Sequence, residues 1–117
     1  MSDSILRDKS KSFAKEIVFL CRRLKQNSVE AALVNQLLRS GTSVGANIHE
    51  AQYAQGTKDF ISKLEIALKE CNESEYWIEL LHEVGNLSKE EADKIRKDCI
   101  ELRRMLVSSV TTLKSKL

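Results

Sequence analysis

One spacing in this sequence has the form of a metal site: Glu79 and His82 make an E-x-x-H motif. Di-iron bundles carry this motif on each of two helices and add a glutamate from each of the other two. Here the motif occurs once, because the second histidine, His49, has Ala46 three residues before it. The sequence therefore favours an exposed or partly packed His82 near a helix C-terminus, where the helix dipole stabilises its charge.

Other reactive residues lack a catalytic spacing. His49-Glu50 begins like a zinc-protease motif, but the second histidine of H-E-x-x-H is missing. There is no glycine-rich phosphate loop and no plausible Ser/His/Asp set. The cysteines, Cys21, Cys71 and Cys99, are odd in number and widely spaced, which indicates small buried hydrophobes in a reducing compartment. We expect a protein that is not an enzyme and uses no metal or cofactor.

A polar row follows one side of the second predicted helix, beside its apolar stripe. Such a row is either an ordinary solvated face or a partly buried hydrogen-bonded network at a helix or subunit interface. Solvated faces are commonly rich in Lys and Glu, whereas Ser and Asn are poor helix formers that gain little in water. The composition favours the network. Its members are Gln36, Arg39, Ser43, Asn47 and Glu50.

The third predicted helix offers partners for that row. Glu75 is expected within the apolar stripe, between Cys71 and Ile78, where a carboxylate needs a donor such as Arg39 or Asn47. An alternative is that these polar side chains bind a small ligand in a bundle pocket. A second, partly apolar surface beside the stripe predicts self-association, because one small bundle cannot cover both. It comprises Ile66, Glu73, Trp77 and Leu80.

Two glycines interrupt the second predicted helix. Each interior glycine costs a helix about 0.8–1.0 kcal/mol relative to alanine, so a contact must compensate. Gly41 and Gly45 form a G-x-x-x-G in surroundings too polar for a membrane. The spacing predicts that another helix backbone approaches here, in preference to a ligand or hinge role.

Basic residues gather in the first and last predicted helices, while the third is acidic. Clustered Lys and Arg suit contacts with nucleic-acid phosphates. Acidic residues interleave with the bases of the last helix, however, as they do on an ordinary solvated helix. Both interpretations stay open. The candidate nucleic-acid contacts are Arg22, Arg23, Lys25, Lys94, Arg96, Lys97, Arg103 and Arg104.

The elements that position these residues are four helices in a single domain of 117 residues. The absence of proline and a 3, 4 spacing of apolar residues predict helices at about 4–26, 29–54, 58–84 and 89–115. Asn27 is expected in the left-handed turn conformation, Ser28 as a helix cap, and Ser88 with Glu91 as a capping box. Short loops make an up-down-up-down four-helix bundle. With no membrane span and no signal peptide, we expect a cytoplasmic protein.

The chain from about Phe13 to Leu113 resembles the four-helix-bundle family encoded in intervening sequences of bacterial 23S ribosomal RNA genes, the S23-like proteins. Two patterns carry the resemblance: R-S-x-x-S-x-x-x-N-I-x-E over residues 39–50, and F-I-x-x-L-x-I-A over residues 60–67 with Glu73 and Glu75 downstream. Ala51 departs from the glycine that the family often has, which affects only the local helix end.

The resemblance implies a ring-like homopentamer. It also implies similarity to the accessory proteins of diversity-generating retroelements, which bind nucleic acid and a reverse transcriptase. We therefore expect a non-enzymatic, homo-oligomeric bundle that binds RNA or DNA through basic residues of its first and last helices. The alternative is a protein-interaction or scaffold module with no nucleic-acid role.

Overall fold

The computed structural model describes residues 2–117, with side chains from residue 4 onward. It contains four helices: α1 (Ser2–Gln26), α2 (Ala31–Ala51), α3 (Thr57–Glu83) and α4 (Lys89–Ser115). No strand occurs within residues 2–117, so the all-α prediction is confirmed. The second helix is shorter at both ends than the expected 29–54.

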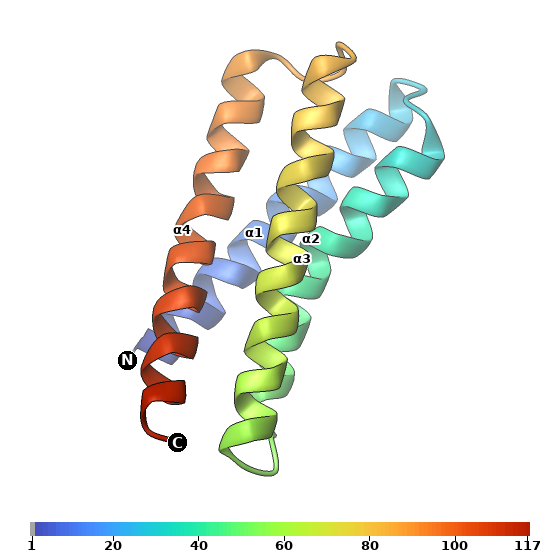
Figure 1. Cartoon of the computed structure of the whole chain (residues 1–117). Helices are drawn as coiled ribbons and strands as arrows, with labels where there is room; N and C mark the ends of the chain where they lie inside the picture. The colour runs from blue at the N-terminus through green and yellow to red at the C-terminus, as the bar shows by residue number, and fades with distance from the viewer. Residues whose placement is uncertain (1) are drawn as a thin grey trace.

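Consecutive helices run antiparallel and form a rod of 47 × 22 × 19 Å, with α1 and α2 behind α3 and α4 in Figure 1. Sequential helices pack closely against each other, and α1 makes sparser contact with α4. Two ion pairs nonetheless join the terminal helices, Lys9 with Glu101 and Arg23 with Glu91. None of the four helices combines the length and apolar character needed to cross a lipid bilayer.

Apolar side chains at spacings of three and four line the inside of the bundle, as the sequence pattern indicates. In α1 the pattern predicts a seam of Leu6, Ser10, Phe13, Ile17, Leu20 and Leu24, and all six residues are buried. The pattern is wrong by one position in three places, where the neighbouring residue takes the buried position. The spacing predicts Leu33, Phe60 and Ser109 at core positions. Their neighbours Val34, Ile61 and Val110 are buried instead.

The turns differ in detail from the expected capping. Ser28, and not Asn27, has the positive φ of 61° that ends the first helix, and Glu30 precedes α2 without a side-chain cap. At α4, the Ser88 hydroxyl accepts a hydrogen bond from the Glu91 backbone N–H at 3.1 Å. The Glu91 carboxylate pairs with Arg23 of α1, so it ties two helices together.

The glycines of α2 face α1. A β-carbon on Gly41 would lie 2.8 Å from Ile17 Cγ2, well inside normal contact. One on Gly45 would lie 3.4 Å from the backbone oxygen of Ser10, at ordinary contact distance. Gly41 therefore makes room for the Ile17 side chain, and the backbone approach that the spacing predicts occurs at Gly45, which explains why residues with poor helix propensity stand inside a helix.

The three cysteines are buried and free. The Cys21 thiol donates to the backbone oxygen of Val34 at 3.7 Å, and the Cys71 thiol to that of Cys99 at 3.2 Å. Burial raises the pKa of the Cys21 thiol to about 11. These thiols are inner packing groups that have local hydrogen-bond acceptors.

Candidate functional site

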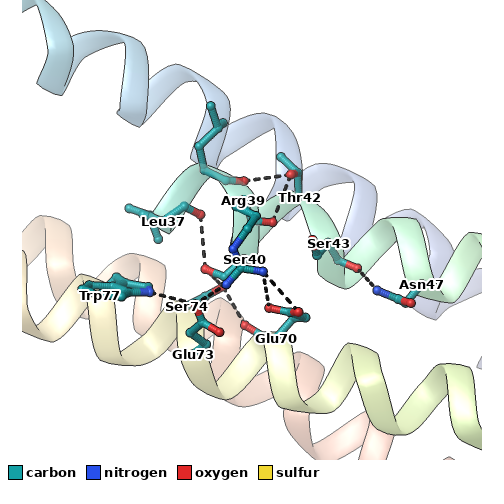
Figure 2. A network of polar contacts seen from close by, with 11 residues as sticks. Leu37, Arg39, Ser40, Thr42, Ser43, Asn47, Glu70, Glu73, Ser74 and Trp77 are labelled. Carbon is teal, nitrogen blue, oxygen red and sulfur yellow. Dashed lines mark hydrogen bonds and ion pairs between the residues drawn. The ribbon is translucent and has the colours of Figure 1, made fainter. Parts of the chain in front are cut away.

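A network of charges joins α2 to α3 at the surface of the bundle. The Arg39 guanidinium pairs with Glu70 at 3.2 Å and with Glu73 (Figure 2). The Glu73 carboxylate also accepts a hydrogen bond of 3.1 Å from the indole N–H of Trp77. The Trp77 hydrogen bond and the adjacent Arg39 lower the pKa of the Glu73 carboxyl. This network connects α2 to α3 through Arg39.

Two serines lie buried beneath that network. The hydroxyl oxygens of Ser40 and Ser74 are 3.0 Å apart, and both residues are excluded from solvent (Figure 2). Backbone carbonyls supply the remaining acceptors, Leu37 for Ser40 at 3.4 Å and Glu70 for Ser74 at 2.8 Å. Small hydroxyls that satisfy one another allow α2 and α3 to approach closely without an orphaned polar group.

The rest of the polar row makes local contacts. The Asn47 amide donates to the backbone oxygen of Ser43, one turn earlier, at 2.9 Å (Figure 2). Glu50 pairs with Lys63 of α3 at 3.3 Å. Both Ser43 and Asn47 are half-buried, whereas Arg39 and Glu50 are more exposed. Arg39 and Glu50 therefore link the row to α3, the Asn47 side chain between them bonds to its own helix, and Gln36 is exposed.

The expected environment of Glu75 is wrong. Ser74 takes the buried position of the stripe, and Glu75 turns toward α4. There its carboxylate pairs with Arg103 and lies 3.5 Å from Arg96, which also reaches Glu79 at 3.3 Å. One residue is 100° around a helix, so Glu75 meets the neighbour on the opposite side from Arg39 and Asn47. The polar residues of α3 form two clusters and not one network.

The structure also places the residues of the E-x-x-H motif. Glu79 pairs with Arg96, and the His82 ring nitrogen Nδ1 lies 2.9 Å from the backbone oxygen of Leu87. His82 thus holds the turn between α3 and α4. Within residues 4–117, no cluster of three or more His, Cys, Asp or Glu side chains has the arrangement needed for a metal ion.

A hollow of about 820 Å³ lies at the end of the bundle where α2 turns into α3. Phe60, Met105 and Leu113 form part of its apolar wall, and Arg104 lies at its edge. A second hollow, of about 680 Å³, follows the α1–α2 contact and includes Gly45 and Glu50. Neither hollow brings Arg39, Asn47 and Glu75 together, so the polar row does not form the ligand pocket considered from the sequence.

The eight candidate nucleic-acid residues fall into two groups. Arg23, Arg96 and Arg103 are engaged in the ion pairs that hold α4 to α1 and α3. The others make no ion pair with any side chain of residues 4–117 and are exposed to solvent. These five are Arg22, Lys25, Lys94, Lys97 and Arg104.

The outer face of α1 carries a basic stripe. Lys11, Lys15, Phe19 and Arg22 follow one another at spacings of 4, 4 and 3 and are all exposed. We call these four residues the α1 stripe. Its lysines form no ion pair with side chains of residues 4–117. Neither lysine is among the contacts predicted from the sequence, although their helical spacing from Arg22 places them on the same face.

Acidic residues separate the α1 stripe from the bases of α4. A groove between the two helices is lined by Asp8, Glu16, Asp98 and Glu101, with Lys9 among them. Burial and a hydrogen bond with Asp98 raise the pKa of the Glu16 carboxyl. Such a groove repels phosphate, so an anionic polymer is favoured on the outer face of α1 and not between α1 and α4.

The comparisons with known proteins agree with this architecture. The family model for the 23S rRNA-intervening sequence protein matches residues 2–108. Among solved structures, the chain is similar to a protein of unknown function from the S23 ribosomal protein family of Bacteroides thetaiotaomicron VPI-5482, with 45% identity and a TM-score of 0.92. That similarity covers 95% of this chain and 99% of the other. No curated protein matches the chain.

Proposed function

Since the chain belongs to the 23S rRNA-intervening sequence protein family, we propose that it is a non-enzymatic, homo-oligomeric bundle that binds RNA or DNA through basic residues of α1 and α4. The observation that supports this most is the α1 stripe, where Lys11, Lys15 and Arg22 are exposed and have no acidic partner among residues 4–117. Unpaired cations on one helix face are available to displace counterions from phosphates.

The basic residues of α4 have a secondary part in this proposal. Lys94, Lys97 and Arg104 are exposed, but Glu90 and Glu101 lie on the same helix. Arg96 and Arg103 serve the fold, because both pair with the half-buried Glu75 carboxylate and releasing either would remove one of its two partners. The phosphate contacts are therefore assigned first to α1.

Self-assembly would increase the affinity of this small surface. The family resemblance suggests a ring-like homopentamer, and repeated copies of a weak patch bind one polymer much more tightly than a single copy does. The α3 helix offers uncovered apolar area for such contacts: Ile66 is 38% exposed and Tyr76 is 57% exposed. We include a homopentamer in the proposal on these grounds.

The same area supports a second candidate function, a protein-interaction module without nucleic-acid binding. Tyr76 packs its ring edge-on against Trp77, with centroids 5.0 Å apart, so two aromatic rings of α3 form one firm surface. Aromatic residues are enriched at the centres of protein interfaces. This candidate needs only the α3 surface and leaves the α1 stripe without a role.

The two candidates are separated by titrating labelled structured RNA and duplex DNA with the purified protein across salt, with the oligomer mass recorded in the same buffer. The test variant is Lys11→Glu/Lys15→Glu/Arg22→Glu. Its matched control, Lys58→Glu/Lys69→Glu/Lys116→Glu, makes the same change of net charge at exposed positions of α3 and the C-terminus.

We expect micromolar or tighter binding that weakens steeply with salt, a large loss in the α1 variant and a smaller loss in the control. Equal losses in the two variants would show that net charge alone attracts the nucleic acid and would contradict the assignment to α1. No binding by an intact wild-type oligomer would contradict the nucleic-acid proposal and favour the protein-interaction module.

A further inference from the structure

The α1 stripe contains one residue that phosphate binding does not require. Phe19 is 63% exposed although it lies in the middle of a helix with an otherwise well-buried apolar seam. Its ring is not needed by the core, because Leu20 and Cys21 on the same turn are buried. A large aromatic side chain that is exposed to water between basic residues indicates a binding role.

The surroundings of Phe19 are cationic. Lys15 precedes it by one turn, and Arg22 follows it by three residues with its guanidinium carbon 5.9 Å from the ring centroid. This cation–π contact places the guanidinium over one face of the ring and leaves the other face for a base. The arrangement combines a π face with positive charge on either side along the helix.

Ring and charge together match the chemistry of an unpaired nucleotide. Any of the bases can stack on an aromatic face, and the phosphates on either side of the base are attracted to nearby cations. From Lys11 to Arg22 the helix rises roughly 16 Å, enough to follow a few linked nucleotides. In a duplex, by contrast, the base faces are already stacked on one another and are closed to Phe19.

A protein partner fits this surface less well. The centres of protein interfaces are depleted in charged residues, and Lys in particular is disfavoured there. The exposed helix neighbours of Phe19 are Lys15, Arg22 and Arg23, while Glu16, three residues before it, is half-buried and lines the groove toward α4. A single exposed ring among cations gives a protein partner little continuous apolar area. It gives a nucleotide an aromatic face for its base and positive charge for its phosphates.

We propose that Phe19 is a stacking platform for an unpaired base, so that the nucleic acid bound by the α1 stripe is single-stranded or presents an unpaired loop. This inference rests on the proposed nucleic-acid binding and adds the class of ligand. Phe19 supplies the base contact, Arg22 the adjoining cation, and Lys11 and Lys15 the phosphate contacts.

The test compares a labelled single-stranded oligothymidylate of about 20 nucleotides with the same strand in a duplex, at matched salt. Phe19→Leu keeps an apolar side chain of similar size but removes the aromatic face. Phe19→Trp keeps and enlarges that face. Phe19 is exposed, so neither change affects core packing. The mass of each oligomer is measured in the binding buffer.

Wild type should bind the single strand more tightly than the duplex. Because stacking on an aromatic side chain is worth about 1–3 kcal/mol per base, Phe19→Leu should weaken single-strand binding about fivefold to 150-fold. Duplex binding should change by less than about twofold, and Phe19→Trp should keep the single-strand affinity.

Two results would overturn the inference. If Phe19→Leu binds the single strand as wild type does while charge reversal of the α1 stripe abolishes binding, the stacking platform is refuted and the proposed function survives. If Phe19→Leu changes the oligomer mass, the ring serves contact between copies of the chain and not a base. Absence of all binding by wild type would remove the proposed function together with the inference.

Discussion

Gly41 of α2 and Ile17 of α1 lie so close that a β-carbon on the glycine would stand 2.8 Å from Ile17 Cγ2. The isoleucine is fully buried and branched at its β-carbon, so it has little room or rotational freedom to move away. The tightest side-chain packing against a glycine is therefore at Gly41, whereas Gly45, four residues later, meets the Ser10 backbone at a looser distance.

This difference predicts opposite effects for two alanine substitutions. Gly41→Ala should destabilise the fold, because overpacking costs about 1–3 kcal/mol and exceeds the gain in helix propensity of about 1 kcal/mol. Gly45→Ala should be neutral or stabilise by up to about 1 kcal/mol, since its methyl group meets ordinary contact distances. Urea denaturation measures both, and a stabilised Gly41→Ala variant would contradict the packing.

The buried hydroxyls of Ser40 and Ser74 should prove coupled. Each change to alanine should cost about 1 kcal/mol, and the double variant should cost less than the sum because the Ser40–Ser74 contact that both single changes remove is lost only once. Ser43→Ala is the control, since the Ser43 side chain is half-buried on the same helix. Denaturation of the four variants tests this, and strictly additive losses would rule out the coupling.

Arg103 and Arg104 are sequence neighbours with different roles. Arg103→Glu should lower the free energy of unfolding by about 1.5–3 kcal/mol, because it removes the nearer of the two arginine partners of the half-buried Glu75 and places a second carboxylate beside it. Arg104→Glu should stay within about 0.5 kcal/mol of wild type. Equal stability of the two variants in urea denaturation would show that the Glu75 pair contributes nothing.

The lowered pKa of the Glu73 carboxyl makes its contribution depend on pH. The carboxylate stabilises the folded state above the usual carboxyl pKa of about 4.3, and this stabilisation is lost as the pH falls through the lower folded value. Wild type should therefore be more stable than Glu73→Gln at pH 7, by up to about 1 kcal/mol for a partly exposed pair. The gap should close in acid, and thermal unfolding of both proteins at neutral and acid pH checks whether it does.

The three thiols should be inert in the folded protein. Burial raises the pKa of Cys21 to about 11, and the hydrogen bond with Cys71 together with burial raises that of Cys99. The same hydrogen bond lowers the pKa of Cys71, but its side chain is fully buried and out of reach of a reagent. A thiol-specific disulfide reagent at pH 8 should react slowly with native protein and with all three cysteines once it is denatured. Ser115→Cys, at an exposed position, supplies the positive control. Rapid labelling of native wild type would show that the core opens readily.

Part of the candidate site was accessible from the sequence and part was not. Helical periodicity in α1 pointed to its whole buried seam, and the poor helix formers Ser43, Asn47, Gly41 and Gly45 marked α2 as a contact surface. Lys11, Lys15 and Phe19 were overlooked because a sequence shows which residues share a face but not whether acidic residues of another helix neutralise that face. The structure places Arg23 beside Glu91 and leaves the α1 stripe without such partners among residues 4–117.

What the sequence determined by itself is the set of helices and the sides on which they are apolar, because both follow from local spacing and from the absence of proline. Which charges meet was decided by tertiary structure alone. Ser74 and Glu75 are adjacent in the chain, yet the serine faces Ser40 of α2 and the glutamate faces Arg103 of α4. Successive residues of a helix point in directions 100° apart. Only the placement of the neighbouring helices determines which partner each residue contacts.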